Sequence, residues 1–123
     1  MKILLVENSR TVRAVLTRQL EQEGYAVQTV STGLEAINTL MLNDYDLLIM
    51  DVFMPELNGY EATQRIRAIK GEKAKVPIIA FTSSTNERDK RTCLEAGMND
   101  YVIKSEKNDD LLALLKRYAS QCH

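Results

Sequence analysis

Five short apolar segments alternate with longer amphipathic stretches, and this alternation constrains the fold of the chain more than any other feature of its sequence. The apolar segments are residues 2–6, 25–30, 45–51, 76–82 and 100–104. Their length and their β-branched and apolar content are typical of β-strands. Between them, apolar residues recur at helical spacing, as Val12, Leu16 and Leu20 do. Strict alternation predicts an α/β fold with a parallel sheet, helices on both faces and right-handed crossovers.

Residues typical of helix ends stand between these segments. Glycines are expected to end helices at three positions, Gly24, Gly71 and Gly97. Thr32 and Glu35 have the spacing of a capping box. Asn86 and Asn108 are predicted N-caps of the helices that follow them. The predicted boundaries therefore agree with the apolar pattern.

The length and apolar content of the chain are those of one domain. It has 123 residues, of which 45% are hydrophobic, so we expect a single domain over residues 1–123 whose last few residues are disordered. Three of the strand segments are nearly continuous apolar runs, as central strands buried on both faces are. The segments at 25–30 and 100–104 are predicted to be the two edge strands.

The charges of the chain nearly cancel, with 16 basic against 17 acidic residues and a formal net charge of −1. That balance argues against nucleic-acid binding by this domain. No apolar run approaches the length of a membrane span, so no membrane insertion is expected. The two cysteines, Cys93 and Cys122, are too few for a disulfide framework, and a reducing cytoplasmic location is expected. Cys93 is predicted to be a buried thiol.

Polar residues end four of the five predicted strands. These residues are Glu7 and Asn8, Asp51, Thr82 and Ser83, and Lys104. In an open parallel sheet, ligands bind beyond the carboxyl ends of the strands. Two carboxylates, an amide, two hydroxyls and one ammonium are therefore predicted to meet at one rim of the sheet.

The composition of this rim favours phosphoryl transfer to a carboxylate. The segment after the first strand, "ENSRT", contains neither of the phosphate-binding patterns G-x-G-x-x-G and G-K-[ST]. No histidine is expected near the rim. An aspartate can act as the nucleophile, and oxygen ligands can hold Mg²⁺. A lysine and a hydroxyl can bind the phosphoryl oxygens.

Several motifs give the chain a resemblance to a known family. They are "ILLVEN" (3–8), "LLIMDVFMPELNGYEATQRIR" (47–67), "PIIAFTSS" (77–84) and "AGMNDYVIKS" (96–105). With this set of motifs the chain resembles the CheY-like receiver domains of bacterial response regulators, in particular those attached to hybrid histidine kinases. The resemblance spans essentially the whole chain. It implies a flavodoxin-like, doubly wound (βα)5 fold with strand order 2-1-3-4-5.

The resemblance also implies roles for the rim residues, beginning with a metal site. Asp51 resembles the phosphoacceptor and would also bind Mg²⁺. Asn8 occupies the position of an acid that ligates the metal directly, and Glu7 that of its neighbour, which acts partly through water. The backbone carbonyl of Phe53 would be a further metal ligand.

The remaining roles concern the phosphoryl group and the response to it. Thr82, Ser83 and Lys104 resemble the phosphoryl-binding residues. Thr82 also resembles the switch hydroxyl, and Tyr101 the aromatic residue that changes rotamer on activation. The output face would consist of the helix that begins near Asn86, the strand at 100–104 and the last helix, contacting an effector or a domain fused to this one.

Two positions depart from the family pattern. Asn8 stands where the family mostly has an acid, and weak Mg²⁺ binding is therefore expected. Because Asn is also a favoured N-cap, metal contact and helix capping both remain open for Asn8. Ser105 follows Lys104 where the family usually has proline, so the peptide bond between them is expected to be trans.

Three functions are compatible with these observations. In the first, a histidine kinase or histidine phosphotransfer domain phosphorylates Asp51, and the chain is a signalling switch rather than an enzyme. In the second, favoured by Asn8 and Ser105, it is a pseudo-receiver that binds proteins without being phosphorylated. The third is a phosphatase of the haloacid-dehalogenase type. Phosphatases of that class have a D-x-D motif. Here Phe53 occupies the position of the second Asp, so the second acid is missing.

Overall fold

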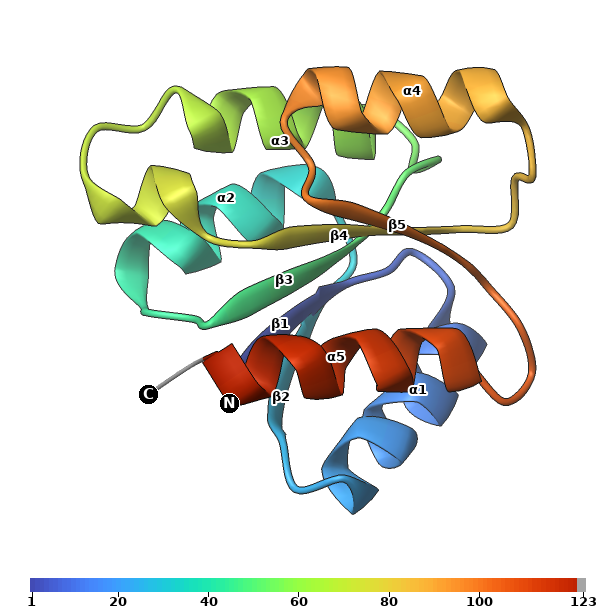
Figure 1. The fold of residues 1–123 in the computed structure, drawn as a ribbon. Helices are drawn as coiled ribbons and strands as arrows, with labels where there is room; N and C mark the ends of the chain where they lie inside the picture. The colour runs from blue at the N-terminus through green and yellow to red at the C-terminus, as the bar shows by residue number, and fades with distance from the viewer. Residues whose placement is uncertain (122–123) are drawn as a thin grey trace.

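The computed structural model describes residues 1–121, and Cys122 and His123, with the predicted disorder of the chain end, lie outside the described residues. Five parallel strands form one sheet in the order β2-β1-β3-β4-β5, as predicted (Figure 1). The strands are β1 (Lys2–Val6), β2 (Ala26–Val30), β3 (Leu47–Asp51), β4 (Ile78–Thr82) and β5 (Asp100–Ile103). The edge positions of β2 and β5 are confirmed.

Helices cover both faces of this sheet. They are α1 (Arg10–Gln22), α2 (Gly33–Leu42), α3 (Gly59–Arg67), α4 (Glu87–Ala96) and α5 (Asp109–Gln121), with a short 3₁₀ helix η1 (Glu72–Lys75) before β4. Figure 1 shows α2, α3 and α4 on one face and α1 and α5 on the other. None of the helices within residues 1–121 is long and apolar enough to cross a membrane.

Each face of the sheet carries its own apolar layer, because successive side chains of a strand point to opposite faces. In β1, Leu4 and Val6 pack in the layer under α2, α3 and α4, and Ile3 and Leu5 pack in the layer under α1 and α5. Every residue of β3 and of β4 is buried, as expected of central strands covered on both faces. Cys93 is buried in the layer under α2, α3 and α4, and its burial was predicted.

Two N-cap predictions are confirmed in whole or in part. Asn86 caps α4 by accepting a hydrogen bond from the backbone N–H of Arg88. Thr32 caps α2, but the carboxylate of Glu35 accepts from the hydroxyls of Ser31 and Thr32, and the reciprocal bond of a capping box is not formed.

The side chains of Asn8 and Asn108 do not cap the helices that follow them. The N-cap of α1 is Ser9, whose hydroxyl accepts from Val12 N–H, so Asn8 does not cap this helix. Asn108 precedes α5 with φ +54°, but its side chain accepts from the N–H of Ser105 and donates to the side chain of Gln19. It therefore fastens the β5–α5 loop to α1 instead of capping α5. The peptide bonds within residues 1–121 are all trans, including the one between Lys104 and Ser105.

Arg67 joins several elements at the end of the sheet opposite the polar rim. Its guanidinium donates hydrogen bonds to the carbonyls of Gly97, Ala74 and Val76 at 2.7–2.9 Å and to the side-chain oxygen of Asn99 at 2.9 Å. These acceptors lie at the end of α4, in η1 and before β4 and β5. One side chain therefore ties α3 to the amino ends of two strands.

Gly59 lets the start of α3 approach the end of β3. A Cβ atom at this position would lie 2.6 Å from the backbone oxygen of Asp51 and 2.9 Å from Val52 Cα. The Gly59 N–H also donates to the carbonyl of Val52 at 2.8 Å. The position therefore requires glycine because of close backbone contact at the rim.

We expect Gly59→Ala to lower the free energy of unfolding by about 1–3 kcal/mol, the usual cost of overpacking against atoms that cannot move aside. Alanine favours helix over glycine by about 1 kcal/mol, so a loss would show that the clash outweighs helix propensity. Urea denaturation measures the change. Gln64→Ala, a change at an exposed position of the same helix, controls for an alanine substitution without a clash. A Gly59→Ala protein as stable as wild type would contradict the prediction.

Candidate functional site

The strand register brings two carboxylates together at the rim. Val6 pairs with Met50 across β1 and β3, so Glu7 and Asp51, the next residues, stand at the same level of the sheet. Both side chains are buried, Glu7 with 1% and Asp51 with 5% of its surface exposed. Buried carboxylates need charged or hydrogen-bonded partners.

Lys104 is the partner of both acids. Its Nζ lies 2.8 Å from Glu7 Oε2 and 3.4 Å from Asp51 Oδ1. It also lies 5.4 Å from the centroid of the Phe81 ring. Apart from this ion pair, Glu7 Oε2 is buried with no hydrogen-bond partner among the described residues. A carboxylate oxygen has more than one lone pair, so it could accept a further ligand.

The environment of Asp51 favours its protonated form. Burial, and next the neighbouring charge of Glu7, raise the pKa of Asp51 from 3.8 to about 6, although Lys104 acts in the opposite direction. The loss of an acid at position 8 has therefore not relieved Asp51 completely, because Glu7 remains beside it.

The loop that carries Glu7 and Asn8 is held by α1. Arg13 Nη1 donates to the carbonyl of Glu7 at 2.8 Å and to that of Asn8 at 3.1 Å. The N–H of Ser9 donates to Glu7 Oε1 at 3.0 Å. Sequence reasoning missed Arg13 and Ser9, whose roles depend on the path of the loop and not on any sequence pattern.

The oxygen atoms at the rim fit Mg²⁺ in kind. The predicted ligands are two carboxylates, the side chain of Asn8, which is exposed, and the carbonyl of Phe53, all of them hard oxygen donors. Glu7 Oε2, buried and with no hydrogen-bond partner apart from its ion pair with Lys104, agrees with such a role. The set has only two acids, however, and residues 1–121 contain no cluster of three or more Asp, Glu, His or Cys that could hold a metal.

The ring of Phe53, two residues beyond Asp51, is exposed and packs against α3. The side chain is 54% exposed, and its ring meets Tyr60 edge to face at a centroid distance of 6.2 Å. Tyr60 is in α3, so the ring lies over the β3–α3 side of the rim.

Ser84 connects the two predicted switch residues. Thr82 is buried, and its Oγ1 accepts from the N–H of Ser84 at 3.2 Å. The hydroxyl of Tyr101 donates to the Ser84 carbonyl. Ser84 Oγ donates to Asp89 Oδ2 in α4 at 2.5 Å. Ser84 was not singled out in the sequence; Ser83, which was predicted to bind phosphoryl oxygens, is exposed.

The response regulator receiver domain family matches residues 3–116 of the chain. The transcription factor Skn7 of Saccharomyces cerevisiae is 41% identical over 116 residues, which are 94% of this chain and 18% of that protein. The chain spans about half the length, or less, of the first curated relatives that it matches.

Solved structures with the same fold include two that contain magnesium. The receiver domain of the sensor histidine kinase PA1611 from Pseudomonas aeruginosa, with a magnesium ion in its active-site cleft, is 39% identical with a TM-score of 0.87, over 97% of both chains. The response regulator TrrA from Thermotoga maritima, in complex with Mg²⁺ and BeF, is 32% identical with a TM-score of 0.84, over 95% of this chain and 97% of that one.

We expect Asp51→Asn to raise the free energy of unfolding at pH 7 by about 1–3 kcal/mol in metal-free buffer. An acid whose pKa is raised in the folded state binds its proton more tightly there than in the unfolded chain. The stability it contributes is therefore lost as pH rises from about 4 to about 6. Asn keeps the side chain neutral throughout.

Urea denaturation with a chelator at pH 4 and pH 7 measures this difference. At pH 4 the two proteins should be nearly equal in stability. Glu95→Gln, a change of an exposed acid on α4, controls for general loss of negative charge. An Asp51→Asn protein less stable than wild type at pH 7 would show that the Lys104 contact outweighs burial.

Proposed function

The chain belongs to the response regulator receiver domain family, and from that premise we propose that it is a phosphoacceptor switch phosphorylated on Asp51. Receiver domains are parts of two-component signalling systems and generally act as phosphoacceptors. The observation that carries the proposal is the position of Lys104 Nζ, 3.4 Å from the buried Asp51 Oδ1 at the end of the central strand β3. This is where an ammonium can neutralise a phosphoryl group.

In the proposed reaction, a carboxylate oxygen of Asp51 attacks the phosphorus of a phosphohistidine. The new O–P bond forms as the N–P bond breaks, and the imidazole nitrogen leaves with the electron pair. Asp51 must be ionised to attack. The charge of Glu7 raises the pKa of Asp51 and so opposes ionisation, whereas Lys104 lowers this pKa and favours it. Lys104 is placed to pair with an oxygen of the transferred group.

Asp51, Glu7, the amide oxygen of Asn8 and the carbonyl of Phe53 would hold Mg²⁺. When bound, the ion would neutralise charge on the phosphoryl oxygens. Asn8 supplies an oxygen without a negative charge, so we propose that the ion binds weakly. Glu7 Oε2, which has no hydrogen-bond partner apart from its ion pair with Lys104, is the atom best able to compensate.

The proposed response runs from Thr82 through Ser84. Thr82 Oγ1 now accepts a hydrogen bond from the N–H of Ser84. If the Thr82 hydroxyl turned to donate to a phosphoryl oxygen, the loop that contains Ser84 would move with it. Because Tyr101 donates to the Ser84 carbonyl, its ring would follow this loop. We propose that α4, β5 and α5 form the output face; Leu94 and Ile103, on α4 and β5, are 49% and 41% exposed.

A histidine kinase or a histidine phosphotransfer domain is the proposed phosphodonor. Receiver domains of this family interact with proteins of both classes. An effector, or a domain fused to this one in a longer protein, is the proposed partner of the output face. These reactions would take place in the cytoplasm.

A pseudo-receiver is the second candidate function. The observation that favours it is the pairing of Lys104 with Glu7 at 2.8 Å, closer than with Asp51 at 3.4 Å. In this arrangement the ammonium already offsets one of the two negative charges of the acid pair, and Asn8 provides no further charge to attract a metal ion. Such a protein would bind its partners without phosphorylation.

Incubation with acetyl phosphate and Mg²⁺, followed by intact-mass measurement, tests phosphorylation. We expect wild-type protein to gain the mass of one phosphoryl group. Asp51→Asn should gain none, and Asp46→Asn should gain the same as wild type. Equal gain by Asp51→Asn would place the modification elsewhere, and no gain by wild type would favour the pseudo-receiver.

Asn8→Asp should tighten Mg²⁺ binding about ten- to a hundredfold, the scale on which changes in metal-site partners alter affinity. The variant restores a negative charge beside Glu7 and Asp51. Calorimetric titration of both proteins measures the change, with Asn38→Asp, a substitution on α2, as the control for added charge. Equal affinities of the Asn8→Asp and wild-type proteins would indicate that the ion does not contact residue 8.

A further inference from the structure

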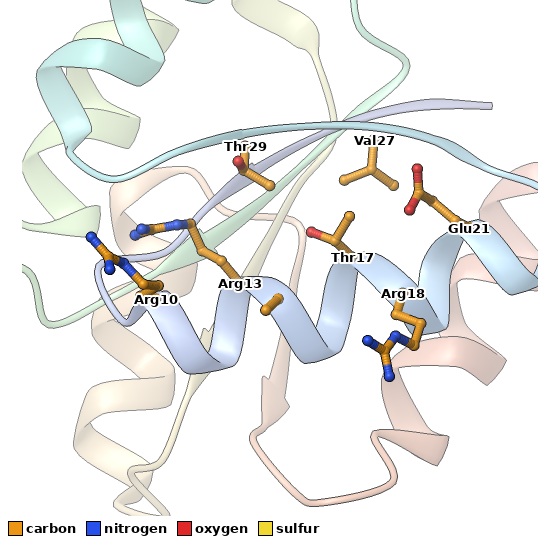
Figure 2. Close-up of a pocket in the computed structure, with 8 residues that line it drawn as sticks. Arg10, Arg13, Thr17, Arg18, Glu21, Val27 and Thr29 are labelled. Carbon is orange, nitrogen blue, oxygen red and sulfur yellow. The ribbon is translucent and has the colours of Figure 1, made fainter.

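A groove of about 480 Å³ runs between α1 and the edge strand β2, and none of its lining residues is a proposed metal ligand or phosphoryl-binding residue (Figure 2). The α1 side contributes Arg10, Arg13, Arg18 and Glu21, and the β2 side contributes Val27 and Thr29. The charged lining therefore consists of three arginines and one glutamate on a chain whose net charge is −1.

The outer edge of β2 presents unpaired backbone groups along this groove. Within the sheet β2 pairs only with β1, where Ala26 N–H donates to Met1 and Val30 accepts from Glu7 N–H. Backbone groups of alternate residues in a strand point to opposite edges. The N–H and C=O of Val27 and Thr29 therefore face away from β1, so the two residues whose side chains line the groove also offer hydrogen bonds there.

The two ends of the groove differ in charge. Figure 2 shows the guanidinium groups of Arg10 and Arg13 near the Thr29 end, and Glu21 beside Val27. Neither Arg10 nor Arg13 forms an ion pair with a carboxylate of residues 1–121. Arg13 uses Nη1 for the carbonyls of Glu7 and Asn8, which leaves its other N–H groups available.

We propose that this groove binds an extended acidic peptide segment, which adds to the outer edge of β2 as a sixth strand. Its backbone would pair with Val27 and Thr29, and its side chains on the α1 side would lie two residues apart. An acidic side chain would sit beside Thr29, near Arg10 and Arg13. An apolar side chain would pack on Val27.

Charge favours such a peptide over a second copy of the chain. Two copies paired edge to edge would bring twice the lining of one groove together, which is six arginines against two glutamates. An acidic segment instead meets the arginines with opposite charge. The simpler explanation, that the arginines only protect an exposed edge from pairing, predicts no binding at all.

The probe is a capped pentapeptide of sequence Thr-Val-Thr-Glu-Thr, titrated to about 10 mM against ¹⁵N-labelled protein, a range that detects millimolar affinity. We expect saturable shifts of the Val27 and Thr29 amides and of the Arg10 and Arg13 side chains. The same peptide with Gln in place of Glu should bind about two- to fivefold more weakly, the scale of an exposed ion pair. N-methylation of the backbone nitrogens that face β2 should abolish binding without any change to the protein.

Protein variants test the same surface. Arg10→Gln should weaken binding of the Glu peptide about two- to fivefold and leave binding of the Gln peptide unchanged. Arg88→Gln, a change of an exposed arginine on α4, should affect neither. The proposal is overturned if no shifts occur, if the N-methylated peptide binds as well, or if Glu and Gln peptides bind equally. It is also overturned if the Val27 and Thr29 shifts depend on protein concentration alone, which would identify a second copy as the occupant.

Discussion

The contact of Lys104 with Glu7 and Asp51 is the interaction on which the functional rim depends. Two carboxylates buried side by side repel each other, and the ammonium from the end of β5 is the charge that permits them to remain there. It links the carboxyl ends of β1, β3 and β5 across the width of the sheet. Any charged ligand that enters this site must change the electrostatic balance among the three groups. Ligand binding is therefore coupled to the local structure.

A short series of hydrogen bonds connects the rim to α4. Ser84 donates its N–H to Thr82 and accepts from Tyr101 on its carbonyl, and its hydroxyl reaches Asp89 in α4. One residue thus joins a buried strand end, an edge strand and a helix. A displacement of this loop by a fraction of an ångström would alter three sets of hydrogen bonds together, which makes it suited to two discrete arrangements.

The fold and the meeting of Glu7, Asp51 and Lys104 at one rim could be predicted from the sequence, whereas the details of the loops could not. Apolar periodicity predicts where the strands end, and in a parallel sheet those ends lie at the same edge. Capping depends on the conformation of single residues: Ser9, one position beyond Asn8, takes the N-cap of α1. Ser84, like Arg13, contributes through contacts that no periodicity in the sequence encodes.

The two ends of the sheet are fastened by different means. At the polar rim the fastening is ionic, while at the far end Arg67 donates only to carbonyls and an amide oxygen, which carry no formal charge. A proton, a metal ion or a phosphoryl group can therefore change the electrostatic balance at one end and leave the bonds at the other unaltered. The amino ends of β4 and β5 are therefore held by contacts that do not respond to charge, so a change of charge at the rim acts on the sheet from one end alone.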